Sequence, residues 1–342
     1  MSGARRGTVA VVGAGIAGLA AAARLRAAGV DVAVFDKGRS VGGRVATRRR
    51  AAGQWDHGAQ FCTARDPRFA ARLAELAAAG AVAPWAGPFH TLTDGELGAD
   101  PRPGQRWVGV PGMSALARGL AGDLPVTTGV RCEALRRDAA GWGLHLAELT
   151  AGVEREVGPF AALVLAIPPA QADALLVAAE VGGPVAAAAV AHAGVLQPCC
   201  AALVAFAEPV AELGGGLFVV DRVLAWAAHD GGKPGRGGAA TWVLHGAAGW
   251  SEAVFAQDPA GNAQALLAAF ARCLGRALPA VQHVEGHRWR YALAAATADV
   301  GAVVDAEAGL VLCGDAFTGG RVEGAWLAGE RGAALLLDAL RG

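Results

Sequence analysis

A glycine-rich turn close to the start of the chain constrains the fold more than any other feature. The β-branched run from Thr8 to Val12 predicts a short strand, and the residues GAGIAG follow it at 13–18. An alanine- and leucine-rich stretch over 19–28 predicts a helix that stops at Gly29, and residues 30–35 predict a second strand. Asp36 closes this strand, 23 residues after Gly13. The order strand, glycine turn, helix, strand and acid predicts a βαβ unit with parallel strands.

The turn has the spacing of a dinucleotide-binding site. Gly13 permits the tight turn, Gly15 lets the backbone approach a pyrophosphate, and Gly18 lets the helix pack on the strand. The helix N-terminus, at Ile16 and Ala17, presents free N–H groups to the anion. An ordinary βα turn is the alternative, but it does not explain the acid at the end of the second strand.

Asp36 is expected to bind a ribose. A carboxylate at this position accepts hydrogen bonds from ribose hydroxyls and disfavours a 2′-phosphate, although Lys37 and Arg39 follow it. All three side chains are candidate cofactor contacts. FAD and NAD both use this turn, so the choice between them depends on other segments.

Gly42-Gly43-Arg44 follows a few residues after the acid. It is similar to the RxGGR-type motif of the flavoprotein family that includes monoamine oxidases and phytoene desaturases, where the glycines pass close to the FAD pyrophosphate and the arginine pairs with it. An arginine suits a bidentate phosphate contact where a lysine would not. Gly43 and Arg44 are therefore candidate FAD contacts. A solvated arginine in a basic stretch with residues 48–50 is the alternative.

Residues 45–49 and 54–56 predict a hairpin that ends at His57. In amine-oxidase-like flavoproteins the equivalent segment passes the flavin ring. The resemblance implies that Asp56 and Gly58 lie near the isoalloxazine, with Ala59, Gln60 and Phe61 as cofactor contacts. We expect His57 to be a polar loop residue with satisfied hydrogen bonds rather than a catalytic group.

The C-terminal segment repeats the pattern of a strand, a turn and a helix. Residues 309–313 predict a strand, a glycine-rich turn lies at 319–321, and residues 322–340 predict a helix. In FAD enzymes of this fold the Gly-Asp pair after the strand meets the ribityl and pyrophosphate region, and the helix N-terminus points at the flavin N1 and C2 carbonyl. Reduced flavin is negative there, and the helix dipole stabilises that charge. The candidate contacts are Gly314, Asp315, Val322, Glu323, Gly324 and Ala325.

Three segments in this order predict FAD as the cofactor. Cys132, on a strand predicted over 126–135, falls where this superfamily commonly gives a backbone contact to adenine. Cys313 does not lie where monoamine oxidases attach their flavin, so we expect the FAD to be non-covalent.

The rest of the chain predicts a second domain. Apolar strands at 199–206, 217–220, 224–228 and 240–246 and a helix at 262–274 favour a mainly antiparallel sheet with helices beside it. We interpret 84–103 as a Gly/Pro-broken loop and 231–238 as a flexible loop. The predicted fold is α/β, with a Rossmann-type FAD-binding domain (1–65, 104–170 and 291–342) and an inserted substrate domain (66–103 and 171–290), similar to amine oxidases and p-hydroxybenzoate hydroxylase.

Composition and charge exclude several classes of protein. Thirty basic side chains balance thirty acidic ones, so no net field draws the chain to nucleic acid or anionic lipid. The longest apolar stretches, such as 186–196, are shorter than the roughly 20 residues of a membrane span, and residues 1–7 lack a cleavable apolar region. We therefore expect a cytoplasmic protein. The six cysteines form no CxxC pair, and His283 and His287 lie on a predicted strand about 13 Å apart, so no metal is expected.

Several inner segments of the chain resemble those of the bacterial renalases. This resemblance is more specific than the similarity to the general flavoprotein motifs. The resemblance implies an FAD-dependent oxidase that acts on the 2- and 6-dihydro isomers of NAD(P)H. Hydride passes to flavin N5 to give β-NAD(P)+, and O2 reoxidises the flavin to give H2O2. The segments are FDK at 35–37, GGR at 42–44, GAQ at 58–60, TARD at 63–66, RWVG at 106–109, PGMS at 111–114, TWVLH at 241–245, HRW at 287–289, YA at 291–292, CGD at 313–315 and GRVEGAWL at 320–327.

Hydride transfer to a flavin needs positioning more than acid or base catalysis. We expect Trp289, Tyr291 and Trp226 to offer aromatic faces to a nicotinamide, and His245 to donate a hydrogen bond to its carboxamide. Gln60 completes this candidate set, and Arg288 pairs either with a substrate phosphate or with a neighbouring carboxylate. A place in the core is the alternative for each aromatic residue.

Two other functions stay open at this point: a flavin-containing amine oxidase and a flavin-binding module without turnover. Phe61-Cys62 and Ala316-Phe317-Thr318 depart from the forms associated with bacterial renalases. These departures bear on specificity and not on the cofactor. The sequence leaves the preferred isomer, the choice between NAD and NADP, and the oligomeric state open.

Overall fold

The computed structural model describes residues 7–210, 213–295 and 299–341, and its contacts divide the chain into two compact units. Unit 1 consists of Met1–Gly43, Ala117–Leu196 and Ala294–Gly342; unit 2 consists of Arg44–Leu116 and Gln197–Leu293. Residues 44–65 and 104–116, which we predicted in the FAD-binding domain, group with unit 2, and residues 171–196 group with unit 1. Most of the N-terminal segment 1–7 lies outside the described residues.

Unit 1 is built on a six-stranded sheet in the order β19-β20-β13-β1-β2-β9. All neighbours are parallel except β19, which pairs antiparallel with β20. Parallel strands covered on both faces are apolar throughout, and every residue of β1 and β13 is buried. The strands are β1 (Val9–Val12), β2 (Val32–Asp36), β9 (Val126–Thr128), β13 (Ala162–Leu165), β19 (Ala302–Asp305) and β20 (Leu310–Cys313). The predicted Rossmann-type fold is confirmed.

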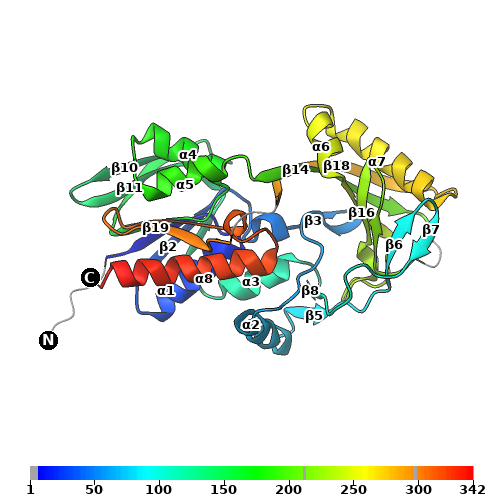
Figure 1. Ribbon diagram of the computed structural model, residues 1–342, viewed down its shortest axis with the longest axis horizontal. Coiled ribbons are helices and arrows are strands. Elements are labelled where there is room, and N and C mark those ends of the chain that lie inside the picture. Colours follow the sequence, from blue (N-terminus) through cyan, green and yellow to red (C-terminus); the bar gives the residue numbers. More distant parts are fainter. Residues whose placement is uncertain (1–6, 211–212, 296–298, 342) are drawn as a thin grey trace. The chain divides into compact units, whose positions relative to one another are not determined.

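Helices α1 (Ile16–Ala27) and α8 (Val322–Ala339) lie side by side along this sheet (Figure 1). They approach closely because Gly329 lacks a side chain: a Cβ there would lie 2.1 Å from the carbonyl oxygen of Ala17. Unit 1 also contains an antiparallel three-stranded sheet, whose third strand the sequence did not predict because most of its residues are exposed. The remaining elements are β10 (Val130–Asp138), β11 (Gly141–Glu148), β12 (Glu154–Phe160), α4 (Pro169–Ala178), α5 (Pro184–His192) and η3 (Asp315–Phe317).

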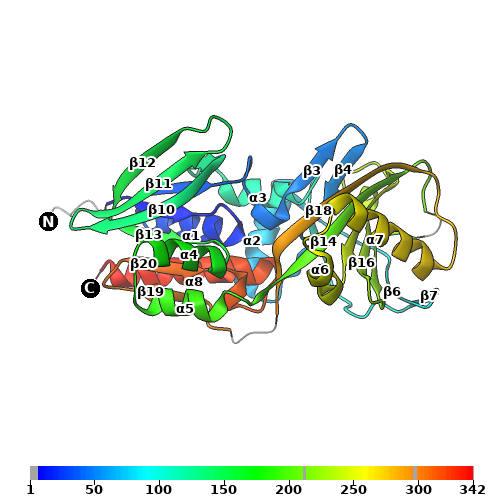
Figure 2. The same ribbon diagram turned by 90° about the horizontal axis from the view of Figure 1, so that it is seen from above.

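Unit 2 is built on a seven-stranded sheet in the order β18-β14-β17-β16-β15-β6-β7. Figure 2 shows β18, β14 and β16 with helix α7 in this unit. The pairs β14–β17, β17–β16, β16–β15 and β6–β7 are antiparallel and β15 with β6 is parallel, so the predicted, mainly antiparallel sheet is confirmed. The interpretation of 84–103 as a loop was wrong, because this segment supplies two strands between its glycines and prolines. The strands are β6 (Phe89–Thr93), β7 (Glu96–Gly98), β14 (Leu196–Phe206), β15 (Gly216–Val219), β16 (Leu224–His229), β17 (Thr241–Gly246) and β18 (Val281–Ala294).

The two faces of this sheet have different covers. Helix α7 (Pro259–Leu274) covers one face, where Trp242 lies 5.2 Å from Phe270 between ring centroids. The hairpin of β3 (Thr47–Arg50) and β4 (Gly53–Asp56) covers the other, where Trp55 packs on Val243. Adjacent residues of a strand point to opposite faces, so β17 contacts both covers. The other elements of unit 2 are α2 (Pro67–Ala78), β5 (Val82–Pro84), β8 (Trp107–Gly109), η2 (Asp230–Gly232) and α6 (Ala248–Val254). Two elements, η1 (Gly43–Val45) and α3 (Ser114–Ala121), begin in one unit along the chain and end in the other.

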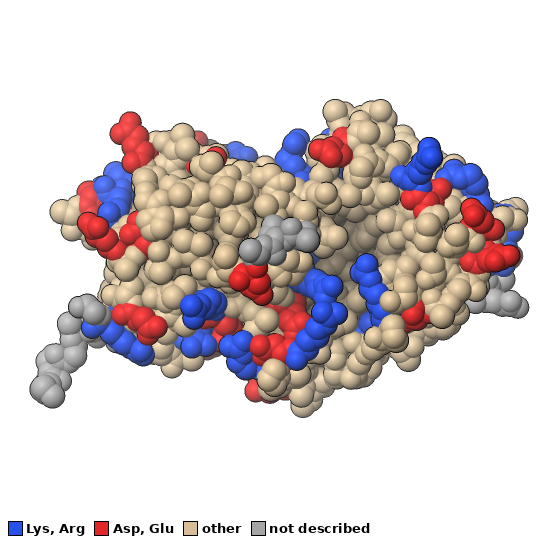
Figure 3. All heavy atoms as spheres, viewed as in Figure 1, with Lys and Arg blue, Asp and Glu red and all other residues tan. Residues whose placement is uncertain are grey.

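Basic and acidic side chains are interspersed on the face of each unit that Figure 3 shows. Within the described ranges, no helix is both long and apolar enough to cross a bilayer. Among the same residues, no set of three or more His, Cys, Asp or Glu side chains is arranged to hold a metal ion.

Candidate functional site

The glycine turn of unit 1 has the backbone geometry that a dinucleotide requires. Gly13 has a φ of +105°, and a Cβ there would lie 2.5 Å from the carbonyl oxygen of Ala166. A Cβ at Gly18 would lie 1.8 Å from the oxygen of Gly13. At Gly15, by contrast, a Cβ would meet no atom within 4 Å, so the backbone faces open space. This opening at the uncapped start of α1, where the first-turn N–H groups lack a side-chain acceptor, fits an anion.

Asp36 is held by the turn itself. Its two carboxylate oxygens accept hydrogen bonds from the backbone N–H groups of Ala14 and Gly38, each at 2.6 Å. Gly42 lies against the same turn, since its N–H donates to the oxygen of Ala14 at 2.8 Å. A Cβ at Gly43 would lie 3.6 Å from Cα of Gly15. The acid and both glycines of the predicted pyrophosphate motif therefore lie beside the first turn, whereas Lys37 and Arg39 are exposed.

The second glycine turn lies at the same edge of the sheet. Strands β20, β13 and β1 run parallel, so Asp315, just after β20, is at the carboxyl-end edge with the first turn. Helix α8 begins at Val322 without a side-chain cap. A Cβ at Gly324 would lie 2.4 Å from Oγ1 of Thr318, so glycine is required there.

Other predicted contacts are placed as follows. Glu323 is buried in the first turn of α8, and Ala325 follows it. Cys132 lies on β10 next to a register shift, and burial raises the pKa of its thiol to about 12. Two uncapped helix N-termini at the carboxyl edge of a parallel sheet can hold the phosphates of a dinucleotide-type cofactor.

In unit 2, the segment 56–61 leaves β4 and is fixed by the loop before the hairpin. The N–H of Ala59 donates to the carbonyl oxygen of Arg44 at 2.9 Å. A Cβ at Gly58 would lie only 2.1 Å from the same oxygen, so glycine is required at this position. The guanidinium of Arg44, which we predicted at a phosphate, uses Nη1 to donate to the oxygen of Ala292 at 3.0 Å.

Two predicted substrate residues meet at His57. Nε2 of His245 and Nε1 of Trp289 both donate to the carbonyl oxygen of His57, at 3.1 and 2.9 Å. The imidazole of His57 lies 4.9 Å from the Trp289 ring and 4.7 Å from the His287 ring, between centroids. We call these four residues the His57 cluster. The expectation that His57 is a satisfied polar residue was wrong, since its Nδ1 is buried without a hydrogen-bond partner among the described residues.

The imidazoles of the His57 cluster are neutral near pH 7. Burial is the main cause in each case: it lowers the pKa of His57 to about 3 and those of His245 and His287 to about 4. The nearby guanidinium of Arg48 lowers the pKa of His57 and His287 further. Because a carbonyl only accepts, Nε2 of His245 carries the proton and Nδ1 is an acceptor. His245 therefore offers a ligand an acceptor, and not the donor that we expected.

Strand alternation decides which residues of β18 belong to this site. His283 stacks on Trp55 at 5.1 Å, and Glu285 pairs with Arg48 at 2.7 Å. The odd-numbered residues thus face the hairpin, and Tyr291 shares this parity with Trp289.

Arg288 points the other way. Its Nη1 donates to the carbonyl oxygens of Phe255 and Gln257, at 2.6 and 3.0 Å, and so ties β18 to the connection between α6 and α7. These contacts are neither the phosphate nor the carboxylate that we expected for Arg288.

Trp226 joins the site through an aromatic cluster. It lies opposite His245 in the β16–β17 register, and its ring lies 5.8 Å from that of Phe61. This aromatic cluster, which includes Phe61, Phe89 and Trp226, surrounds Arg106. The guanidinium carbon of Arg106 lies 3.8 Å from the Phe89 ring centroid, and its Nη1 pairs with Asp100 at 2.8 Å. Sequence reasoning did not single out Arg106, because its motif RWVG gives no sign that the arginine is buried.

Four charged side chains, which we call the ion cluster, are buried beside the segment 56–61: Asp56, Asp230, Lys233 and Arg236. Nζ of Lys233 lies 3.0 Å from Asp56 Oδ2 and 2.7 Å from Asp230 Oδ1, and Arg236 pairs with both carboxylates. The interpretation of 231–238 as a flexible loop was wrong. The loop folds inward because the two cations neutralise two carboxylates that no solvent reaches.

The ion cluster also sets the charge of Asp56. Burial raises the pKa of this carboxyl, but Lys233 and Arg236, with hydrogen bonds from Thr47 and Met113, outweigh burial and hold the pKa below its usual value. Asp56, predicted near the isoalloxazine, is thus an ionised member of the cluster.

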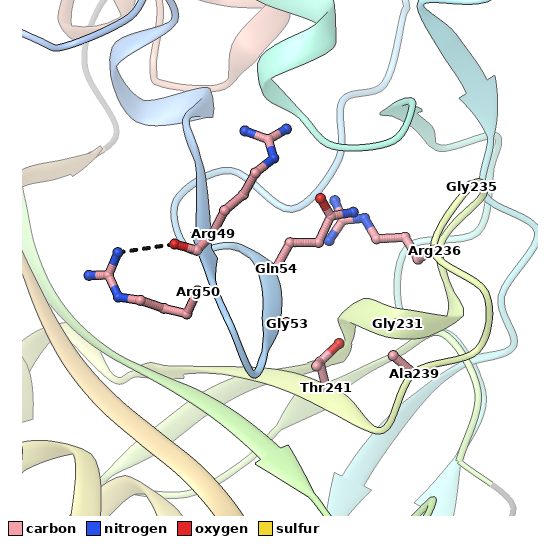
Figure 4. Close-up of a pocket in the computed structure, with 9 residues that line it drawn as sticks. All are labelled: Arg49, Arg50, Gly53, Gln54, Gly231, Gly235, Arg236, Ala239 and Thr241. Carbon is pink, nitrogen blue, oxygen red and sulfur yellow. Dashed lines mark hydrogen bonds between the residues drawn. The ribbon is translucent and has the colours of Figure 1, made fainter.

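A pocket of about 350 Å3 lies outside the hairpin, lined by Arg49, Arg50, Gly53, Gln54, Gly231, Gly235, Arg236, Ala239 and Thr241 (Figure 4). Arg50 is paired with Glu285, and Arg236 belongs to the ion cluster. None of the predicted site residues lines this pocket.

Comparisons with known proteins agree with this architecture. Residues 11–76 match the family described as an NAD(P)-binding Rossmann-like domain, and residues 92–337 match the family described as flavin containing amine oxidoreductase. The chain is 41% identical over 68 residues to protoporphyrinogen oxidase 2, chloroplastic/mitochondrial, of Arabidopsis thaliana. This match spans 20% of the chain and 13% of that relative.

Solved structures share the fold at low sequence identity. A protein from Exiguobacterium sp. 255-15, assigned as a protoporphyrinogen oxidase, has a TM-score of 0.69 and 15% identity, covering 98% of this chain and 100% of its own. Wild-type putrescine oxidase bound to putrescine has a TM-score of 0.66 and 15% identity, covering 97% and 99%. With the family match extending over most of the sequence, the chain belongs to the flavin-containing amine oxidoreductases.

Proposed function

We propose that this flavin-dependent oxidoreductase is an FAD oxidase of dihydronicotinamide dinucleotides. The substrate class is the 2- and 6-dihydro isomers of NAD(P)H, as in the bacterial renalases that the sequence resembles. The C–H bond of the dihydropyridine ring breaks, its electron pair and hydrogen leave as hydride, and the oxidised pyridinium dinucleotide is released. O2 takes up the two electrons and, with one proton from solvent, gives H2O2.

Non-covalently bound FAD would supply the hydride-accepting and O2-reactive chemistry at this site. The openings at Gly15 and Gly314 support this cofactor, because a Cβ at either position would meet no atom within 4 Å and the helix N-termini that follow are uncapped. The residues that we propose hold it are Gly13, Gly15, Ile16, Ala17, Gly18, Asp36, Lys37, Arg39, Gly43, Arg44, Ala59, Gln60, Phe61, Cys132, Gly314, Asp315, Val322, Glu323, Gly324 and Ala325.

The observation that carries the substrate proposal is the arrangement of the His57 cluster, in which imidazole and indole rings lie in contact and His245 and Trp289 share one carbonyl acceptor; the low pKa values of its imidazoles support it. An amine substrate arrives as an ammonium and must lose a proton before hydride can leave. Imidazoles with a pKa of about 3 or 4 are poor acceptors for that proton. The ring of a dihydronicotinamide loses hydride without any prior proton transfer, so a rigid, uncharged aromatic surface suffices.

The described side chains supply that surface. Trp289 and Trp226 offer ring faces on which a nicotinamide can stack, and Tyr291 lies on the same face of β18 as Trp289. Nδ1 of His245 can accept a hydrogen bond from the carboxamide NH2. Gln60 contributes by its position beside the site and not by acid or base chemistry. Arg288 does not bind the nicotinamide ring.

Anaerobic mixing of the yellow protein with defined donors tests this function. We expect rapid flavin bleaching by 6-dihydro-NADH, and none by putrescine or another primary amine. Bleaching by amines alone would show an amine oxidase and overturn the proposal. Bleaching by neither, with dithionite still reducing the flavin, would show a flavin-binding module.

A further inference from the structure

The ion cluster lies next to the amide of Gln60, and the two share Lys233. We propose that Lys233 is a positioning residue that fixes the orientation of the Gln60 amide, and with it the segment 56–61. The kinetic part of this inference rests on the proposed function; the structural part does not.

Lys233 is buried and held by three oxygens. Its Nζ donates hydrogen bonds to Asp56 Oδ2 at 3.0 Å and Gln60 Oε1 at 3.1 Å, and it forms an ion pair with Asp230 Oδ1 at 2.7 Å. The side chain is 0% exposed. Lys233 therefore does not serve as a nucleophile or as an acid toward a ligand in solution. Two of its three contacts hold its charge, and the third reaches the candidate site.

The contact to Gln60 selects one of two orientations of the amide. With Oε1 toward Lys233, Nε2 donates to the carbonyl oxygens of Asp56 and Gly58. A rotated amide would set its NH2 against the ammonium and its oxygen against two carbonyls, which is repulsive at every contact. Lys233 thus determines that Gln60 closes the backbone of 56–58 into its bend. That bend presents the oxygen of His57 to His245 and Trp289.

The balance of charge explains why the ion cluster contains two carboxylates and two cations and not one ion pair alone. Asp56 also accepts the N–H of Met113 at 2.8 Å, and Arg236 Nε donates to the oxygen of Pro111 at 2.5 Å. Two carboxylates and two cations make the cluster formally neutral, and burial raises the pKa of the Asp230 carboxyl, so the cluster carries no excess negative charge beside the site. Removing Lys233 alone leaves a buried negative charge, whereas removing Lys233 with Asp230 leaves the Asp56–Arg236 pair neutral.

This difference gives the test. The FAD-bound protein is compared with Lys233→Met/Asp230→Asn, a charge-balanced variant, and with Gln60→Leu, which leaves the ion cluster intact. Arg272→Met, which removes an exposed pair with Asp221, is the matched control. The measurements are thermal unfolding, backbone hydrogen exchange of peptides covering 56–61, and the rate and Kd of flavin reduction by 6-dihydro-NADH.

We expect the charge-balanced variant to unfold within a few degrees of the wild type but to exchange faster at 56–61. Flavin reduction should slow by roughly ten- to a hundredfold with little change in Kd, as for reactants slightly misplaced. Gln60→Leu should show the same changes, and adding it to the charge-balanced variant should slow reduction no further.

Wild-type exchange and rate in the charge-balanced variant would overturn the proposal and reduce Lys233 to a charge-balancing role. If that variant does not fold, unchanged exchange at 56–61 in Gln60→Leu would overturn it equally. Hydrogen exchange needs no substrate, so it tests the role of Lys233 even in a protein that 6-dihydro-NADH fails to reduce.

Discussion

His245 and Trp289 lie 44 residues apart on two strands and donate to one atom, the carbonyl oxygen of His57. A carbonyl has two lone pairs, so this atom is saturated. The backbone at His57 is therefore fixed from two directions, and the next residue, Gly58, is enclosed between Arg44 and Trp289.

Gly58→Ala should be disruptive. The added Cβ would lie 2.1 Å from the oxygen of Arg44 and 3.2 Å from Trp289, so the segment must move. We expect a loss of about 1–3 kcal/mol in the free energy of unfolding, measured by urea denaturation. Gly261→Ala, in α7 where a Cβ meets nothing within 4 Å, is the control and should be neutral or stabilising by about 0.5–1 kcal/mol. Equal stability of the two variants would contradict the packing described.

The histidines of the His57 cluster should make the protein sensitive to acid. Their pKa in the folded protein lies below the ordinary 6.5, so below pH 6.5 the unfolded chain binds protons that the folded chain does not. As the pH falls below 6.5, each histidine therefore lowers the free energy of unfolding by about 1.4 kcal/mol per pH unit. For His245 and His287 this loss continues until the pH reaches about 4.

The variant His287→Asn should therefore lose less unfolding free energy between pH 6 and pH 5 than the wild type, by about 1.4 kcal/mol. Identical slopes in the wild type and in His287→Asn, from urea denaturation at each pH, would show that His287 binds protons equally in the folded and the unfolded chain.

Gly15→Val should yield colourless protein of normal stability. A Cβ at Gly15 meets no protein atom, so the flavin-free fold has room for the side chain, which instead occupies the space we assign to a pyrophosphate. Flavin absorbance per protein and the melting temperature of the flavin-free form measure the two effects. Stoichiometric FAD in this variant would refute the placement of the cofactor.

Arg288→Met should separate stability from chemistry. The variant loses two hydrogen bonds to carbonyl oxygens, and we expect a cost of about 1–3 kcal/mol in unfolding free energy. The Kd and rate of flavin reduction by 6-dihydro-NADH should stay within about twofold, because Arg288 lies on the face of β18 opposite Trp289. A tenfold weaker Kd would return Arg288 to the substrate site.

Local patterns predicted much of this fold. The glycine turn, the hairpin and strand β17 depend on neighbours close in sequence, so composition and periodicity reveal them. Arg288 could also have been assigned to the correct face by its alternation with Trp289. The short strands β6 and β7 were hidden by glycines and prolines, which mark their ends and not a structureless loop.

The loop at 231–238 shows what sequence reasoning cannot reach. Glycines with Lys233 and Arg236 are typical of a solvated loop, and what buries the two cations is Asp56, whose carboxylate comes from a strand 177 residues earlier. Likewise, nothing local distinguishes Arg106 from an exposed arginine until aromatic rings of other elements surround it. Both sites depend on partners that only the tertiary structure brings together.

Because Lys233 is buried, its reactivity toward a chemical label reports how often the ion cluster opens. Lys37 and Lys233 are its two lysines, and Lys37 is exposed whereas the Lys233 side chain is 0% exposed. An amine-reactive label should therefore modify Lys37 at once, and Lys233 only when the ion cluster separates. Mass spectrometry of one peptide would then measure how often the loop at 231–238 leaves its place, with no engineered probe.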